Sequence, residues 1–227
     1  MRKPFFVAAV VLSCTVPIVS GAAETISGKV SFLTRRGQRP NVNETVVWLE
    51  PLGATKVTKP APQVVQMVTR SKTLLPHVIA VPAGSSIQFP NDDPISHNLF
   101  SLSSGNVFDL GLYRKGAGKS KKFDTPGVVN IYCNVHPNMS AVVQVLQTPY
   151  SASIDSNGVF TIRDVWPGKY RLIAWNELGT VQSDIEVPNS GAFKGSADLT
   201  IDSRGFRSQS HLNKFGKPYT KPSSKDY

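Results

Sequence analysis

The sequence has little cysteine, with two residues in 227. So few cysteines exclude a fold held together by several disulfides. No Cys-x-x-Cys pair occurs, which also excludes a thioredoxin-type site, a c-type haem attachment and a four-cysteine zinc site. Acidic residues are scarce as well, 15 against 25 basic ones, which gives a formal charge of +10. Long stretches with the apolar periodicity of a helix are lacking after the N-terminal region.

The N-terminal residues have the layout of a cleavable export signal. Basic residues at 2–3 precede an uncharged, mostly apolar run at 4–19, and small residues follow at 20–23. The run is shorter than the ~20 apolar residues that a bilayer requires, and it contains Pro17. We therefore expect residues 1–23 to be removed as a signal peptide, leaving a periplasmic protein with no integral membrane span.

The two cysteines differ in their context. Cys14 lies within the export signal, where a lipoprotein anchor is the alternative; Leu12 is a poor residue for such an anchor. Cys133 is then the single thiol of the exported protein, in a compartment that favours disulfides. A lone cysteine in that compartment requires a chemical role.

Short β-rich runs, most of them bounded by Gly, Pro, Asn or Asp, recur along the chain. This pattern predicts an all-β protein built of β-sandwiches rather than alternating strands and helices. The expected strands are 26–33, 45–49, 64–69, 77–81, 86–89, 128–133, 141–146, 159–162, 170–175 and 185–187.

A break at Thr148-Pro149 indicates two sandwiches. We expect the first at 24–147 and the second at 148–203, followed by a basic, disordered tail at 204–227. The first strands leave a choice open. Residues 28–49 faintly repeat the pattern of the second sandwich, so these strands join either one.

Four side chains that bind metals lie in two predicted loops. Cys133, His136 and Met139 lie between two expected strands, and His97 lies upstream in a second loop. Two imidazoles and a thiolate in a plane, with a weak axial thioether, form the ligand set of a blue-copper electron-transfer centre. Sulfur ligands favour the cuprous ion and imidazole accepts both oxidation states, so this set predicts one type 1 copper ion that cycles between them.

These residues resemble the cupredoxin family. The spacing Cys133-x-x-His136-Pro137-x-Met139 is that of an amicyanin-like loop, and the resemblance covers about residues 26 to 147. It implies a plastocyanin-like Greek-key β-sandwich with copper as its cofactor. It also implies that Asn98, directly after the first histidine, ties the two ligand loops together.

Two longer segments carry further resemblances. The stretch 76–146 is similar to an exported bacterial group often labelled methylamine-utilisation proteins. The segments 155–162 and 167–172 resemble carboxypeptidase regulatory-like, transthyretin-like sandwiches. The residues of the second resemblance determine turns and core, so it implies a fold and no activity.

The ligand set predicts a one-electron carrier that is not an enzyme. Only His77 and His211 remain outside the site, too few for the histidine-rich additional copper sites of multicopper oxidases and copper nitrite reductases, and we expect His77 to be a packed or surface residue. The alternatives are a copper-binding or delivery protein without redox cycling, and a non-metal interaction module. A zinc site is disfavoured because Met139 is a poor zinc ligand, which Asp92 and Asp93 would have to replace.

A basic run at 114–122 carries five positive charges and no acid. It is either a solvated hairpin or a docking patch for an acidic redox partner. The family resemblance implies that His136 is the exposed port for the electron, so we expect the partner near His136 or the run from Arg114 to Lys122. Nucleic acid is not an expected partner of an exported protein.

Overall fold

The structure is a computed structural model that describes residues 22–189, 191–208 and 210–219. Most of the expected export signal, including Cys14, lies outside these residues. Strands dominate the described part, where the 3₁₀ turn η1 (Val42–Glu44) is the one helical element, so the predicted all-β class is confirmed. Among the same residues, no helix has the length and apolar character needed to cross a membrane.

Residues 64–146 form one β-sandwich, here called the inserted sandwich. Its first sheet has the order β10-β7-β4-β5, with β3 paired to β7, and its second has the order β6-β12-β11-β8-β9. The strands are β3 (Val64–Gln66), β4 (Val68–Arg70), β5 (Thr73–Leu75), β6 (Val78–Pro82), β7 (Ser85–Asn91), β8 (Leu99–Ser101), β9 (Phe108–Asp109), β10 (Gly116–Phe123), β11 (Gly127–Cys133) and β12 (Ser140–Leu146).

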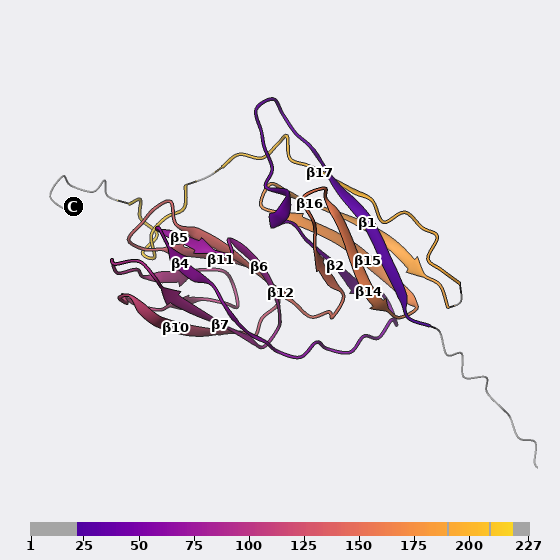
Figure 1. Cartoon of the computed structure of the whole chain (residues 1–227), viewed down its shortest axis with the longest axis horizontal. Helices are drawn as coiled ribbons and strands as arrows, with labels where there is room; N and C mark the ends of the chain where they lie inside the picture. Colours follow the sequence, from indigo (N-terminus) through magenta and orange to yellow (C-terminus); the bar gives the residue numbers. More distant parts are fainter. Residues whose placement is uncertain (1–21, 190, 209, 220–227) are drawn as a thin grey trace, which may run out of the picture.

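The chain on either side of the inserted sandwich forms a second one, here called the flanking sandwich. Its sheets have the orders β14-β1-β17 and β13-β2-β15-β16. Indigo β1 and β2 lie among the orange strands from the other end of the chain (Figure 1). The strands are β1 (Glu24–Leu33), β2 (Val46–Pro51), β13 (Ser151–Ser153), β14 (Val159–Val165), β15 (Gly168–Asn176), β16 (Gly179–Val187) and β17 (Leu199–Asp202).

Strand pairing differs from the expected division at 24–147 and 148–203. Residues 24–51 belong with 151–202, because β1 pairs with β14 and β17 and β2 pairs with β13 and β15. The alternation along β2 explains the placement. Val47 and Leu49 enter the core of the flanking sandwich, whereas Val46 and Trp48 point to its other face.

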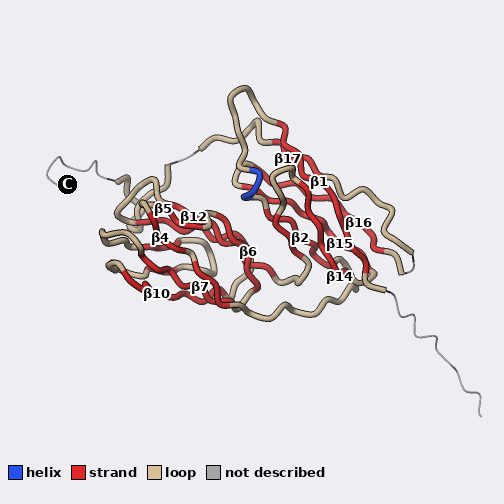
Figure 2. The backbone as a smooth tube through the Cα atoms, in the orientation of Figure 1, coloured by secondary structure: helices blue, strands red, loops and turns tan. Residues whose placement is uncertain are grey.

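That other face of β2 and β15 packs against the inserted sandwich. Val46 and Trp48 form one buried cluster with Ile173 and with Leu146 of β12, and Val78 and Ala80 of β6 pack against it. Figure 2 shows the two groups of strands beside each other. Both faces of β2 are therefore buried, one in a core and the other between the sandwiches.

The basic run lies mostly in a strand rather than in the expected hairpin. Residues 116–123 form β10, an edge strand of its sheet, with exposed lysines at 119 and 122. Charged side chains on an edge oppose pairing with another chain. Gly118 permits a bulge against β7, because its φ is +72° and a Cβ there would overlap the carbonyl oxygen of Phe89.

The C-terminal segment, defined here as residues 210–219, is a second difference from the expected organisation. After β17 the yellow end of the chain returns to the inserted sandwich, near β5 and β11 (Figure 1). It makes the contacts described below, so the expected disordered tail is ordered over this range. Residues 220–227 lie outside the described part.

Candidate metal centre

The structure brings His97, Cys133 and His136 together. Their ligand atoms all lie within 4.8 Å of one another. The sulfur of Cys133 is 3.8 Å from Nδ1 of His97 and 3.6 Å from Nδ1 of His136. Metal bonds of about 2.0 to 2.1 Å to nitrogen and 2.3 Å to sulfur, at tetrahedral to trigonal angles, separate the two atoms by about 3.5 to 3.8 Å. The spacing therefore fits three ligands of one metal ion.

Two backbone hydrogen bonds hold the loop that carries Cys133 and His136. The N–H of Cys133, at the end of β11, donates to the carbonyl of Met139 at 3.0 Å, and the N–H of Met139 donates to the carbonyl of His136 at 3.1 Å. The loop is thus closed on itself between β11 and β12. Met139 is 1% exposed and belongs to the same core cluster as Cys133. Its role as the axial ligand stays a prediction.

His97 is held from outside the ligand loop. Its backbone exchanges two hydrogen bonds with Tyr113, and its side chain is fully buried. Nε2 lies 2.9 Å from a carboxylate oxygen of Asp93, which can only accept. Nε2 therefore carries the proton, and the lone pair on Nδ1 faces Cys133.

Asp93 contacts the site in a way that the sequence did not reveal, since the sequence offered it only as a substitute zinc ligand. It is buried, and its two oxygens accept hydrogen bonds from the backbone N–H groups of Ser71 at 2.6 Å and Lys72 at 2.8 Å. Burial alone would raise the pKa of this carboxyl, but those two donors together with His97 hold it below its usual value. Its donors lie more than twenty residues upstream, so no local motif marks it.

Both histidines of the site favour the neutral form. Burial is the largest cause that lowers the pKa of His97, and the nearby Asp93 only partly opposes it. Burial also lowers the pKa of His136, with a further contribution from His97 nearby, since two adjacent imidazoles oppose protonation of both. Neutral imidazole is the form that binds metal, so both side chains are ready to act as ligands.

Asn98 connects the two ligand loops through its backbone. Its carbonyl accepts a hydrogen bond of 2.8 Å from the N–H of Asn134, while its side chain donates to Asp109. The resemblance implied a residue that ties the loops together. The structure places Asn98 at that junction, with Asp109 as the partner of its side chain.

The C-terminal segment contacts the residues beside the site. The hydroxyl of Tyr219 donates to the carbonyl of Cys133 at 2.7 Å, and His211 stacks on Tyr132 with ring centroids 4.0 Å apart. Lys214 donates its backbone N–H to Asn134 and pairs through Nζ with Asp109 at 2.7 Å. Composition alone, rich in basic residues and poor in apolar ones, gave no sign of this docking.

A second group of metal-binding side chains lies between the sandwiches. Glu44, His77 and Glu177 have ligand atoms within 4.8 Å of one another. Nδ1 of His77 faces the carbonyl of Ser140 at 3.0 Å and Nε2 faces Glu177 at 2.9 Å, so both nitrogens meet acceptors and both carry protons. The hydrogen bond to Glu177 is the main cause that raises the pKa of His77, so this group is an ion pair.

Comparison with known proteins gives similarities over parts of the chain. Residues 134–196, less than half of it, match a family model described as domain II of polysaccharide lyase family 4. Among proteins with curated descriptions, none matches.

Among solved structures, a purple cupredoxin from Nitrosopumilus maritimus is 23% identical over 36% of this chain and 99% of its own, with a TM-score of 0.33. An oxidised amicyanin variant is 16% identical over 36% of this chain and 81% of its own, with a TM-score of 0.35. A copper-containing nitrite reductase from Thermus scotoductus is 18% identical over 52% of this chain and 28% of its own, also at 0.35.

Proposed function

We propose that the protein is a periplasmic type 1 copper protein that carries single electrons between redox partners. The observation that carries the proposal is the buried thiol of Cys133 between two imidazole nitrogens, at 3.8 Å from His97 and 3.6 Å from His136. The cupredoxin-like loop spacing in the sequence supports the same assignment.

His97, Cys133 and His136 would hold the copper, with Met139 as the axial ligand. Bound copper supplies the one-electron chemistry by cycling between its cupric and cuprous forms. The chain supplies a buried sulfur, neutral imidazoles and a loop closed by backbone hydrogen bonds. A fixed ligand set needs little rearrangement when the electron moves, which favours a carrier.

The exposures of the two histidines differ. His97 is fully buried, whereas His136 is partly open to solvent. A partner can therefore approach the metal most closely from the side of His136. The basic run begins at Arg114, directly after Tyr113, which pairs with His97 through backbone hydrogen bonds. We propose that an acidic partner uses His136 and this run together.

The protein as proposed transfers electrons and performs no catalysis of its own. The chain has four histidines, two of which belong to the site. Among the described residues, His77 is engaged in its ion pair and His211 in its stack on Tyr132. Neither one supplies the additional copper site that an oxidase or a nitrite reductase requires.

Voltammetry of the copper-loaded mature protein tests the function. An electron carrier gives one reversible one-electron wave, and it retains its copper through repeated cycles in the presence of a chelator. Loss of copper to the chelator in the cuprous state would instead support delivery of the metal. A protein that takes up no copper would contradict both, and would leave the interaction module as the alternative.

A further inference from the structure

The carboxylate of Asp93 binds the nitrogen of His97 that faces away from the sulfur. The Oδ2–Nε2 distance is 2.9 Å, and the two side chains are 9% and 0% exposed. Because a carboxylate only accepts, the contact fixes the proton of the imidazole on Nε2. The tautomer that results presents the lone pair of Nδ1 to the metal site.

The position of Asp93 is itself fixed. The backbone N–H groups of Ser71 and Lys72 donate to its two oxygens, and the side chain of Asn91 accepts from its backbone N–H at 2.9 Å. Ser71 and Lys72 have φ values of +53° and +57°, in the left-handed region. Both N–H groups of this turn thus point at one carboxylate, which cannot rotate away from His97 without losing them.

We propose that Asp93 is a positioning residue that tunes the copper centre toward the cupric state. This inference rests on the proposed function. A carboxylate hydrogen-bonded to a ligand imidazole orients the ring and makes it more electron-donating. Its buried negative charge also interacts more favourably with the more positive metal ion. The reduction potential is therefore lower than it is with a neutral residue at position 93.

The competing explanation is that Asp93 only shapes the turn at 71–72. The two explanations differ in what they change. Loss of a turn-shaping residue lowers the stability of the metal-free protein. It also weakens the binding of cupric and cuprous copper by the same factor. Loss of a charge on the ligand imidazole changes the ratio of the cupric and cuprous affinities, which the reduction potential measures directly.

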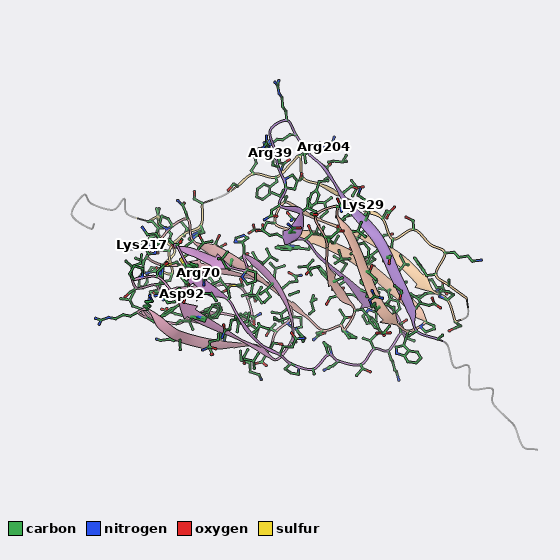
Figure 3. The ribbon with its side chains drawn as sticks, viewed as in Figure 1. Lys29, Arg39, Arg70, Asp92, Arg204 and Lys217 are labelled. Carbon is green, nitrogen blue, oxygen red and sulfur yellow. The ribbon has the colours of Figure 1, made fainter. Side chains whose placement is uncertain are left out.

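Asp93→Asn is the test variant, and Asp92→Asn is its matched control. Asp92 is the adjacent carboxylate, but it lies at the surface and pairs with Arg70 at 2.8 Å (Figure 3). Both variants remove one negative charge. We expect Asp93→Asn to weaken cupric relative to cuprous binding by about 10- to 100-fold. That change raises the potential by about 60 to 120 mV for a one-electron couple.

We expect Asp92→Asn to leave the ratio of the two affinities within about threefold of wild type, because its charge is screened by water. Asp93→Glu keeps the charge and should restore most of the low potential. Equal potentials for the two asparagine variants would overturn the inference. If the wild type itself shows no copper bound to its thiolate, the proposed function fails instead, so the two failures are distinguishable.

A measurement on the wild-type protein covers the case in which Asp93→Asn does not fold. Nitrogen-15 NMR of the diamagnetic cuprous protein reports the protonation of each imidazole nitrogen. We expect a proton on Nε2 of His97 that exchanges slowly with water, together with an unprotonated Nδ1. A proton on Nδ1, or rapid exchange at Nε2, would overturn the inference.

Discussion

His97 and His136 both direct Nδ1 toward the sulfur of Cys133, yet they are held by different means. Asp93 binds the opposite nitrogen of His97, whereas His136 is held by the closed loop that also carries Cys133. The His97 side of the site is therefore buried, whereas the His136 side is partly exposed. Outside the site, both ring nitrogens of His77 are hydrogen-bonded.

The ion pair of His77 with Glu177 makes stability depend on pH. Because the folded protein raises the pKa of His77 above 6.5, the pair stabilises fully below that value, and its contribution is lost as the pH rises through the folded pKa. Glu177 is 40% exposed, so solvent screens the pair, which contributes about 0.5 kcal/mol to the free energy of unfolding. Urea unfolding should show Glu177→Gln destabilised at about pH 6 and close to wild type at about pH 9.

Asp184→Asn is the control for this pH dependence. It removes an exposed ion pair with Arg171, and that pair contains no histidine. Its effect on the free energy of unfolding should therefore be the same at both. An effect of Glu177→Gln that is equally independent of pH would contradict the assignment of a charged His77.

At the scale of elements, segments distant in sequence support the ligand loop. The turn between β4 and β5 holds Asp93, the strand partner of His97 comes just before the basic run, and the C-terminal segment lies on Tyr132 and the carbonyl of Cys133. The ligand loop therefore lies within a frame of three other elements.

The pair between Lys214 and Asp109 should limit local opening of the C-terminal segment. Lys214 is 23% exposed and its partner 43%, so the pair contributes about 0.5 to 1 kcal/mol. Lys214→Ala should therefore speed hydrogen exchange of the amides at 213–219 by about two- to fivefold. Lys217→Ala is the control, because this exposed side chain lies in the same segment (Figure 3). Equal exchange in the two variants would show that the pair does not hold the segment.

At the scale of the whole molecule, one sandwich is inserted into the other. The sequence predicted the all-β class correctly, because turn residues and β-rich runs are local signals. It also placed His97, Cys133 and His136 in one site through their residue types and their positions along the sequence. The partners of β1 lie more than a hundred residues away, so no local signal assigns that strand to the flanking sandwich. The contact of Asp93 with His97 was missed because the turn that orients its carboxylate lies more than twenty residues upstream.

Fragments provide a test of this arrangement. A fragment of residues 148–219 lacks β1 and β2, which are inner strands of the two sheets of the flanking sandwich. It should be unfolded by circular dichroism, because its remaining strands cannot close either sheet. Residues 24–51 joined by a flexible linker to 148–203 should restore a cooperative thermal transition. Cooperative unfolding of the shorter fragment alone would contradict the pairing.

The most direct test of the central claim is the spectrum of the purified mature protein after addition of Cu(II). We predict an intense visible band from charge transfer between the Cys133 thiolate and copper, with one copper bound per chain and a type 1 electron paramagnetic resonance signal. Cys133→Ser should abolish the band while the strand content by circular dichroism stays unchanged. A wild-type protein that shows no such band, or a band that survives in Cys133→Ser, would contradict the account.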